Sequence, residues 1–136
     1  MDPRLIDVMR DCTTGSDEER LSFPEVVGRL MQSGVESYHA DLRRAEKTYY
    51  LANNESHVVA THRITEMPAR DFSADDVAAA VRAIQAGAIG YTMFCNRIAA
   101  AGCVAYIVSL IGRRAVYYGR SGESYVEPFP PAAARP

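Results

Sequence analysis

Apolar residues recur along the chain at two spacings, and these spacings predict its secondary structure. Intervals of three and four residues, typical of one face of a helix, run through four segments. Alternation of apolar and polar residues, typical of strands, follows each pair of helical segments. The helices are predicted after Asp2-Pro3 up to Gly15, from Ser22 to Gly34, from Ser73 to Gly87, and from there up to Gly102. The strands are predicted over 35–42, 48–51, 56–61, 103–110, 115–119 and 124–127.

Sequence signals mark several helix ends. Ser22 and Glu25 have capping-box spacing, and Ser73 stands at a second N-cap position. Gly34 stands where a helix commonly ends in a left-handed residue. These signals predict helix boundaries independently of the apolar pattern.

An internal repeat relates the two sets of segments at a constant offset of 68 residues. Residues 22–58 match residues 90–126 at nine of 37 positions without a gap, whereas composition alone would give roughly two or three matches. The matched pairs are Arg29/Arg97, Gly34/Gly102, Tyr38/Tyr106, Leu42/Leu110, Tyr49/Tyr117, Tyr50/Tyr118, Glu55/Glu123, Ser56/Ser124 and Val58/Val126. The repeat predicts that one structural unit occurs twice.

The predicted fold class is α+β, with an internal duplication of an α-α-β-β-β unit and helices packed on one face of an antiparallel sheet. We expect one domain over residues 1–136, built from repeats at about 1–68 and 69–127. Whether the two three-stranded sheets join is left open. Residues 128–136 hold four prolines and three alanines, and we expect them to form a flexible tail.

Charge and composition exclude some partners and suggest a compartment. The 15 Lys and Arg residues against 17 Asp and Glu give a net charge of -2, so the concentrated positive field of a nucleic-acid or membrane-surface binder is not expected. We expect neither a signal peptide nor a membrane span, because the longest uncharged stretch, 98–112, is too short. Three cysteines without paired spacing fit free thiols, and therefore a cytoplasmic protein.

His39 and Asp41 are the candidates for acid-base catalysis. They stand two residues apart on one predicted strand, so their side chains share a face of the sheet. Ile107 and Ser109 take their places in the second repeat. A carboxylate can orient an imidazole that acts as a general base. The alternative is a polar, solvent-facing sheet surface, which antiparallel sheets favour.

The tyrosines are candidates for ligand binding. Six of the eight fall into the matched pairs 38/106, 49/117 and 50/118. An aromatic ring with a polar tip suits a binding cleft, so Tyr49 and Tyr117 are selected as candidate ligand-binding residues. Packing within the sheet is the alternative, and it is favoured for the other two pairs.

Basic and histidine side chains give three further ligand-binding candidates. The first hairpin loop of each repeat is predicted to be basic, with Arg43, Arg44 and Lys47 in one and Arg113 and Arg114 in the other. Arg113 and Arg114 are candidates for a phosphate-bearing ligand, and a solvated turn is the alternative. His57 is a candidate on the third strand. His39, His57 and His62 lack the spacing of metal ligands, so neither a metal nor a cofactor is expected.

The cysteines are expected to be structural. Cys95 and Cys103 fall in apolar segments, where thiols usually behave as small hydrophobic side chains. A cysteine nucleophile with His39 as its partner is therefore not expected.

Several stretches resemble a known family. They are FPEVV (23–27), GVESYHAD (34–41), TYY (48–50), AGCVAY (101–106) and GRSGE (119–123). Together they resemble the uncharacterised YbcV-like family, whose bacterial and prophage members are often labelled "phage envelope protein". The resemblance covers residues 23–130. It implies a bacterial or prophage origin but no activity, because none is established for the family.

The sequence therefore favours a small non-catalytic protein that binds a protein or a small molecule, on its sheet surface or in a groove between the repeats. A small enzyme that uses His39, Asp41 and neighbouring tyrosines is the alternative. A deep pocket around His39 would favour the enzyme, and a flat exposed face would favour the binding protein. The oligomeric state is left open.

Overall fold

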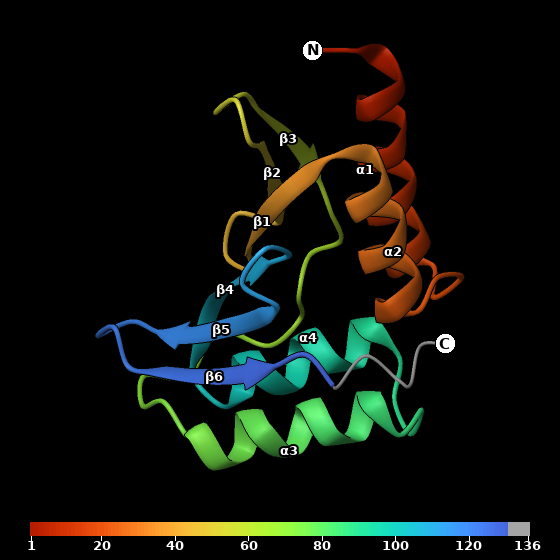
Figure 1. Ribbon diagram of the computed structural model, residues 1–136. Coiled ribbons are helices and arrows are strands. Elements are labelled where there is room, and N and C mark those ends of the chain that lie inside the picture. The colour runs from red at the N-terminus through yellow and green to blue at the C-terminus, as the bar shows by residue number, and fades with distance from the viewer. Residues whose placement is uncertain (131–136) are drawn as a thin grey trace.

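The computed structural model describes residues 1–130, and in that part of the chain the order α-α-β-β-β occurs twice (Figure 1). This confirms the predicted fold class. The first half contains α1 (Pro3–Asp17), α2 (Phe23–Ser33), β1 (Val35–Asp41), β2 (Glu46–Leu51) and β3 (Ser56–Ala60). The second half contains α3 (Ala74–Gln85), α4 (Tyr91–Ala100), β4 (Cys103–Ser109), β5 (Arg114–Gly119) and β6 (Ser124–Pro128).

All six strands form one antiparallel sheet, in the order β3-β2-β1-β4-β5-β6. The two halves thus join through β1 and β4, which answers the question that the sequence left open. His39 lies directly opposite Ile107 at this junction. Since these two positions are also 68 residues apart, the junction is the approximate twofold centre of the sheet.

The helices cover one face of the sheet as two pairs. The pair α1 and α2 contacts β3 and β1, and the pair α3 and α4 contacts β6 and β4 (Figure 1). Their apolar sides bury matched residues, such as Leu30 on α2 and Ile98 on α4, both completely. The opposite face of the sheet is uncovered and leaves Tyr50, Ile107 and Val126 largely exposed.

The predicted caps are present. The Ser22 hydroxyl accepts a hydrogen bond from the Glu25 backbone N–H, and the Glu25 carboxylate accepts one from the Ser22 N–H. The Ser73 hydroxyl caps α3 by accepting from the Asp76 N–H. Gly34 and Gly102 follow α2 and α4 with φ angles of 88° and 93°, a conformation that glycine adopts without strain.

Some element boundaries differ from the prediction. Helix α1 continues through Gly15 to Asp17, because a glycine there allows Leu21 to pack directly on the helix backbone. Strand β2 begins at Glu46, so Lys47, which we expected in a basic loop, lies inside a strand. Strand β6 extends to Pro128, and the Phe129 N–H donates to the Arg113 carbonyl. Residues 131–136 of the expected tail lie outside the described residues.

None of the helices in residues 1–130 is both long enough and apolar enough to cross a membrane.

Candidate functional site

A cavity of about 730 Å³ lies between the two helix pairs, on the helix-covered side of the sheet. Its walls come from both halves at matched positions. Leu21, Ser22 and Phe23 line it from the segment that leads into α2, and Ile89, Gly90 and Tyr91 line it from the segment that leads into α4. The cavity therefore lies at the seam between the repeats.

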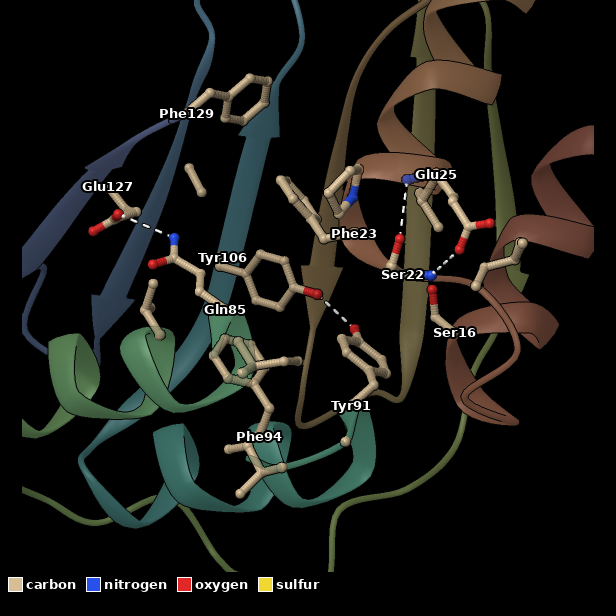
Figure 2. Close-up of a pocket in the computed structure, with 18 of the residues that line it drawn as sticks. Ser16, Ser22, Phe23, Glu25, Gln85, Tyr91, Phe94, Tyr106, Glu127 and Phe129 are labelled. Carbon is tan, nitrogen blue, oxygen red and sulfur yellow. Dashed lines mark hydrogen bonds between the residues drawn. The ribbon is translucent and has the colours of Figure 1, made fainter. Parts of the chain in front are cut away.

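Aromatic rings form much of the cavity wall. Tyr38 and Tyr106 stand on the central strands, with ring centroids 6.5 Å apart. The Tyr106 hydroxyl shares a 2.5 Å hydrogen bond with the Tyr91 hydroxyl from α4 (Figure 2). Burial raises the pKa of both phenols well above the usual range, so both are protonated at neutral pH. Phe23 and Phe129 meet edge to face beside these rings, 5.6 Å apart.

Lys47 is the basic group of the cavity interior. It is the chain's only lysine, and the remaining 14 of its 15 Lys and Arg residues are arginine. Because β2 already begins at Glu46, strand alternation points Lys47 to the helix-covered face together with Tyr49. Its side chain is only 3% exposed, and Nζ lies 4.4 Å from the ring centroid of Tyr91 and 5.8 Å from that of Tyr38.

The Lys47 amine has no acidic partner within 4 Å and no hydrogen bond among residues 1–130. Asp17 is near enough to act on its charge, but Oδ1 and Oδ2 of Asp17 already accept hydrogen bonds from Thr61 and His62. Burial lowers the pKa of Lys47 from the usual 10.5, against the weaker opposing effects of Cys95 and Asp17. The amine is therefore easier to deprotonate than an exposed lysine.

The other charged residues along the cavity all have protein partners. Glu25 belongs to the capping box of α2, and Glu19 accepts from the Thr92 N–H. Arg20 pairs with Glu18, and Glu127 accepts from Arg82, Gln85 and Tyr125. Lys47 is thus the charged group of the cavity that is available to something bound inside.

A second buried polar group lies next to the cavity floor. His62 Nδ1 and Asp17 Oδ1 are 2.8 Å apart, and His62 Nε2 is buried without a hydrogen-bonding partner among the described residues. The hydrogen bond to Asp17 and the nearby Cys95 thiol raise the pKa of His62 to about 9. Burial alone would raise the pKa of Asp17, but the hydrogen bonds from His62 and Thr61 lower it. At neutral pH the two side chains form an ion pair.

We expect Asp17→Asn to lower the free energy of unfolding by about 1–3 kcal/mol below pH 6.5, with a smaller loss at higher pH. The pKa of His62 is raised on folding, so its stabilising effect is complete below 6.5 and is lost as the pH rises through about 9. Denaturant unfolding of both proteins across this range measures the effect. Asp7→Asn, an exposed aspartate on the same helix, is the control and should change little at any pH. A loss for Asp17→Asn that does not vary with pH would contradict the ion pair.

The candidate pair His39 and Asp41 lies outside the cavity, on the uncovered face of the sheet. His39 Nε2 shares a 2.6 Å hydrogen bond with the Tyr118 hydroxyl. Asp41 Oδ1 instead accepts from the backbone N–H groups of Arg43 and Arg44 in the following turn. The strand thus brings His39 to Tyr118, while Asp41 holds the turn. Their proposed catalytic role stays a prediction.

The candidate ligand-binding residues are spread over the molecule. Tyr117 lines the cavity, while Tyr49, two residues after Lys47, shares a buried 2.7 Å hydrogen bond with Thr13. His57 lies opposite Tyr49 on the edge strand β3 and is half-buried. Arg113 and Arg114 are exposed at the β4–β5 turn, where the Arg113 guanidinium lies over the Phe129 ring. Of these five, only Tyr117 reaches the cavity.

The three cysteines, at positions 12, 95 and 103, are buried and free. Burial raises the pKa of the Cys103 thiol to about 12, which suppresses the reactive thiolate. Among residues 1–130, no three or more His, Cys, Asp or Glu side chains are grouped so that they could hold a metal ion.

Fold and cavity together define a small α+β protein in which two α-α-β-β-β units share one sheet and enclose a cavity at their junction. The chain belongs to the DUF1398 family, described as a protein of unknown function, whose model matches residues 14–127. This supports the prediction of an uncharacterised family. No curated protein matches the sequence.

Proposed function

We propose that the protein binds a small, mostly apolar organic molecule in the cavity between its helix pairs. The observation that carries this proposal is the cavity itself, with its volume of about 730 Å³ and its aromatic walls. Ligand sites are typically apolar hollows of roughly 300–1,000 Å³ with a few polar groups that fix orientation. Lys47 and the hydroxyls of Tyr91 and Tyr106 supply such groups here.

Binding without catalysis fits the positions of the titratable groups better than the alternative enzyme. His39 and Asp41 have separate partners on the uncovered face, and neither lines the cavity. The proposal includes a bacterial or prophage origin, which the resemblance to the YbcV-like family supports. It also includes the cytoplasm as the location, which three free cysteines support.

Filling the cavity should abolish binding. Ala115 lines it and is 4% exposed, so Ala115→Phe would place a ring where the ligand lies. The fluorescent probe N-phenylnaphthylamine, which is neutral and apolar, should bind the wild type and should bind Ala115→Phe at least roughly tenfold more weakly, since displacing a buried ring's worth of contact exceeds about 1.4 kcal/mol. Fluorescence titration measures both affinities.

The neighbouring residue provides the matched control. Val116 lies on the same strand but points to the uncovered face, so Val116→Phe adds a ring of the same kind outside the cavity. Val116→Phe should bind the probe as the wild type does. Equal binding by all three proteins, or no binding by the wild type, would contradict the proposal.

A further inference from the structure

We infer that Lys47 is a nucleophilic amine that captures a carbonyl-bearing ligand, an aldehyde or a ketone on an aromatic or aliphatic body, as an imine inside the cavity. This inference rests on the proposed function and names the class of molecule that the cavity takes. It would make the cavity a covalent, reversible binding site.

The choice and position of the residue support this role. The chain places arginine at each of its 14 other basic positions and its single lysine inside the cavity. A guanidinium stays protonated in proteins, whereas a lysine amine loses its proton readily when it is buried. At the matched position of the second half stands Ala115, which also lines the cavity. The amine is therefore specific to one side of an otherwise similar pair of walls.

The surroundings of Nζ keep it free to react. Tyrosine ring faces lie against it at 4.4 and 5.8 Å, and no carboxylate lies within ion-pairing distance among the described residues. Desolvation in an apolar pocket is a known way to activate a lysine, and burial lowers the pKa of this one. The electron pair of the neutral nitrogen is then available at neutral pH to a larger extent than on an exposed lysine.

The reaction balances without a further reagent. The Nζ electron pair forms a bond to the carbonyl carbon, and the carbonyl oxygen takes up a proton to give a carbinolamine. Loss of the amine's second proton and of the hydroxyl group as water then leaves a C=N double bond. One amine and one carbonyl compound give one imine and one water, with no change of oxidation state. The Tyr91 and Tyr106 hydroxyls are hydrogen-bonded to each other on the cavity wall, which leaves one of their two protons to be donated to the carbonyl oxygen.

Reductive trapping tests the inference directly. The probe is benzaldehyde with sodium cyanoborohydride at neutral pH, because the reagent adds hydride to an imine and fixes it as a secondary amine. Intact-mass measurement counts the benzyl groups, and peptide mapping places them. The backbone has two amines in all, Nζ of Lys47 and the N-terminus of Met1, so the map separates them cleanly. We expect one benzyl group on Lys47.

The matched control moves the only lysine to the surface. In the double variant Lys47→Met and Arg44→Lys, the single ε-amine stands at an exposed position of the β1–β2 turn. Labelling of that amine should be at least about tenfold slower than labelling of Lys47, since each pKa unit changes the neutral fraction about tenfold. Circular dichroism and the affinity for N-phenylnaphthylamine show that the variant keeps its fold and its cavity.

The outcomes separate this inference from the proposed function. Probe binding that Ala115→Phe removes, without an adduct on Lys47, would overturn the imine and leave the binding proposal standing. Binding of benzoate that depends on Lys47, again without an adduct, would replace the imine by an ion pair and equally overturn it. An adduct that forms as fast in Ala115→Phe as in the wild type would also overturn it, because the cavity would then play no part.

Discussion

Gly102→Ala is expected to lower the free energy of unfolding by about 3–5 kcal/mol, from left-handed strain together with overpacking against fixed backbone. The residue links α4 to β4 at a φ of 93°. A Cβ there would overlap the carbonyl oxygen of Asp71 and stand 2.7 Å from Cα of Phe72. The Ser73 N–H donates to the Ala101 carbonyl and the Ala69 N–H to the Ala99 carbonyl, so the segment cannot move aside without losing these bonds.

Gly34 is the matched control for this prediction. It links α2 to β1 in the first half with nearly the same φ, 88°, but a Cβ there meets no atom within 4 Å. Gly34→Ala therefore adds the backbone strain alone, about 1–2 kcal/mol. Denaturant titration of the two variants measures the difference. Equal losses would show that the segment over Asp71 yields to the added methyl group.

The fold was predictable because local signals coincide with the global arrangement. Ser22 and Glu25 form the capping box that their spacing predicts, and Gly34 and Gly102 end their helices in the same conformation. Pairing across the centre of the sheet was not predictable, since the contact of β1 with β4 joins residues far apart in sequence. Nothing local in either strand specifies that partner.

The site was predictable in place but not in its residues. The seam between the repeats holds the cavity, and the matched tyrosines at 38, 106 and 117 line it. Lys47 was missed because the strand was predicted to begin at residue 48, which left the lysine in a loop. The signal was present in the sequence, as a lone lysine in step with Tyr49 and Leu51. Tyr91 was missed as a cavity residue because it lies on a helix, where the pattern predicts only packing.

Lys47→Met is expected to raise the free energy of unfolding at neutral pH by about 1–3 kcal/mol, because an unpaired buried amine is replaced by an apolar side chain of similar length. Methionine can fill the same space and contact the Tyr38 and Tyr91 rings through its sulfur. Ala115→Met, at the matched position of the other half, is the control that adds apolar volume to the cavity without removing the amine.

The pH dependence identifies the amine as the cause. Burial lowers the pKa of Lys47 on folding, so the unfolded chain binds the extra proton and the wild type gains stability as the pH rises toward 10.5. The groups around Nζ that titrate or carry charge are Asp17, Cys12, Cys95, Tyr38 and Tyr91, and both variants retain them. The difference between Lys47→Met and the wild type should therefore shrink from neutral pH toward 10.5, whereas the difference for Ala115→Met should stay constant. If Lys47→Met is instead less stable than the wild type, the amine stabilises the fold. If it is more stable, the chain keeps a destabilising group at the centre of its cavity, as proteins do where that group serves binding.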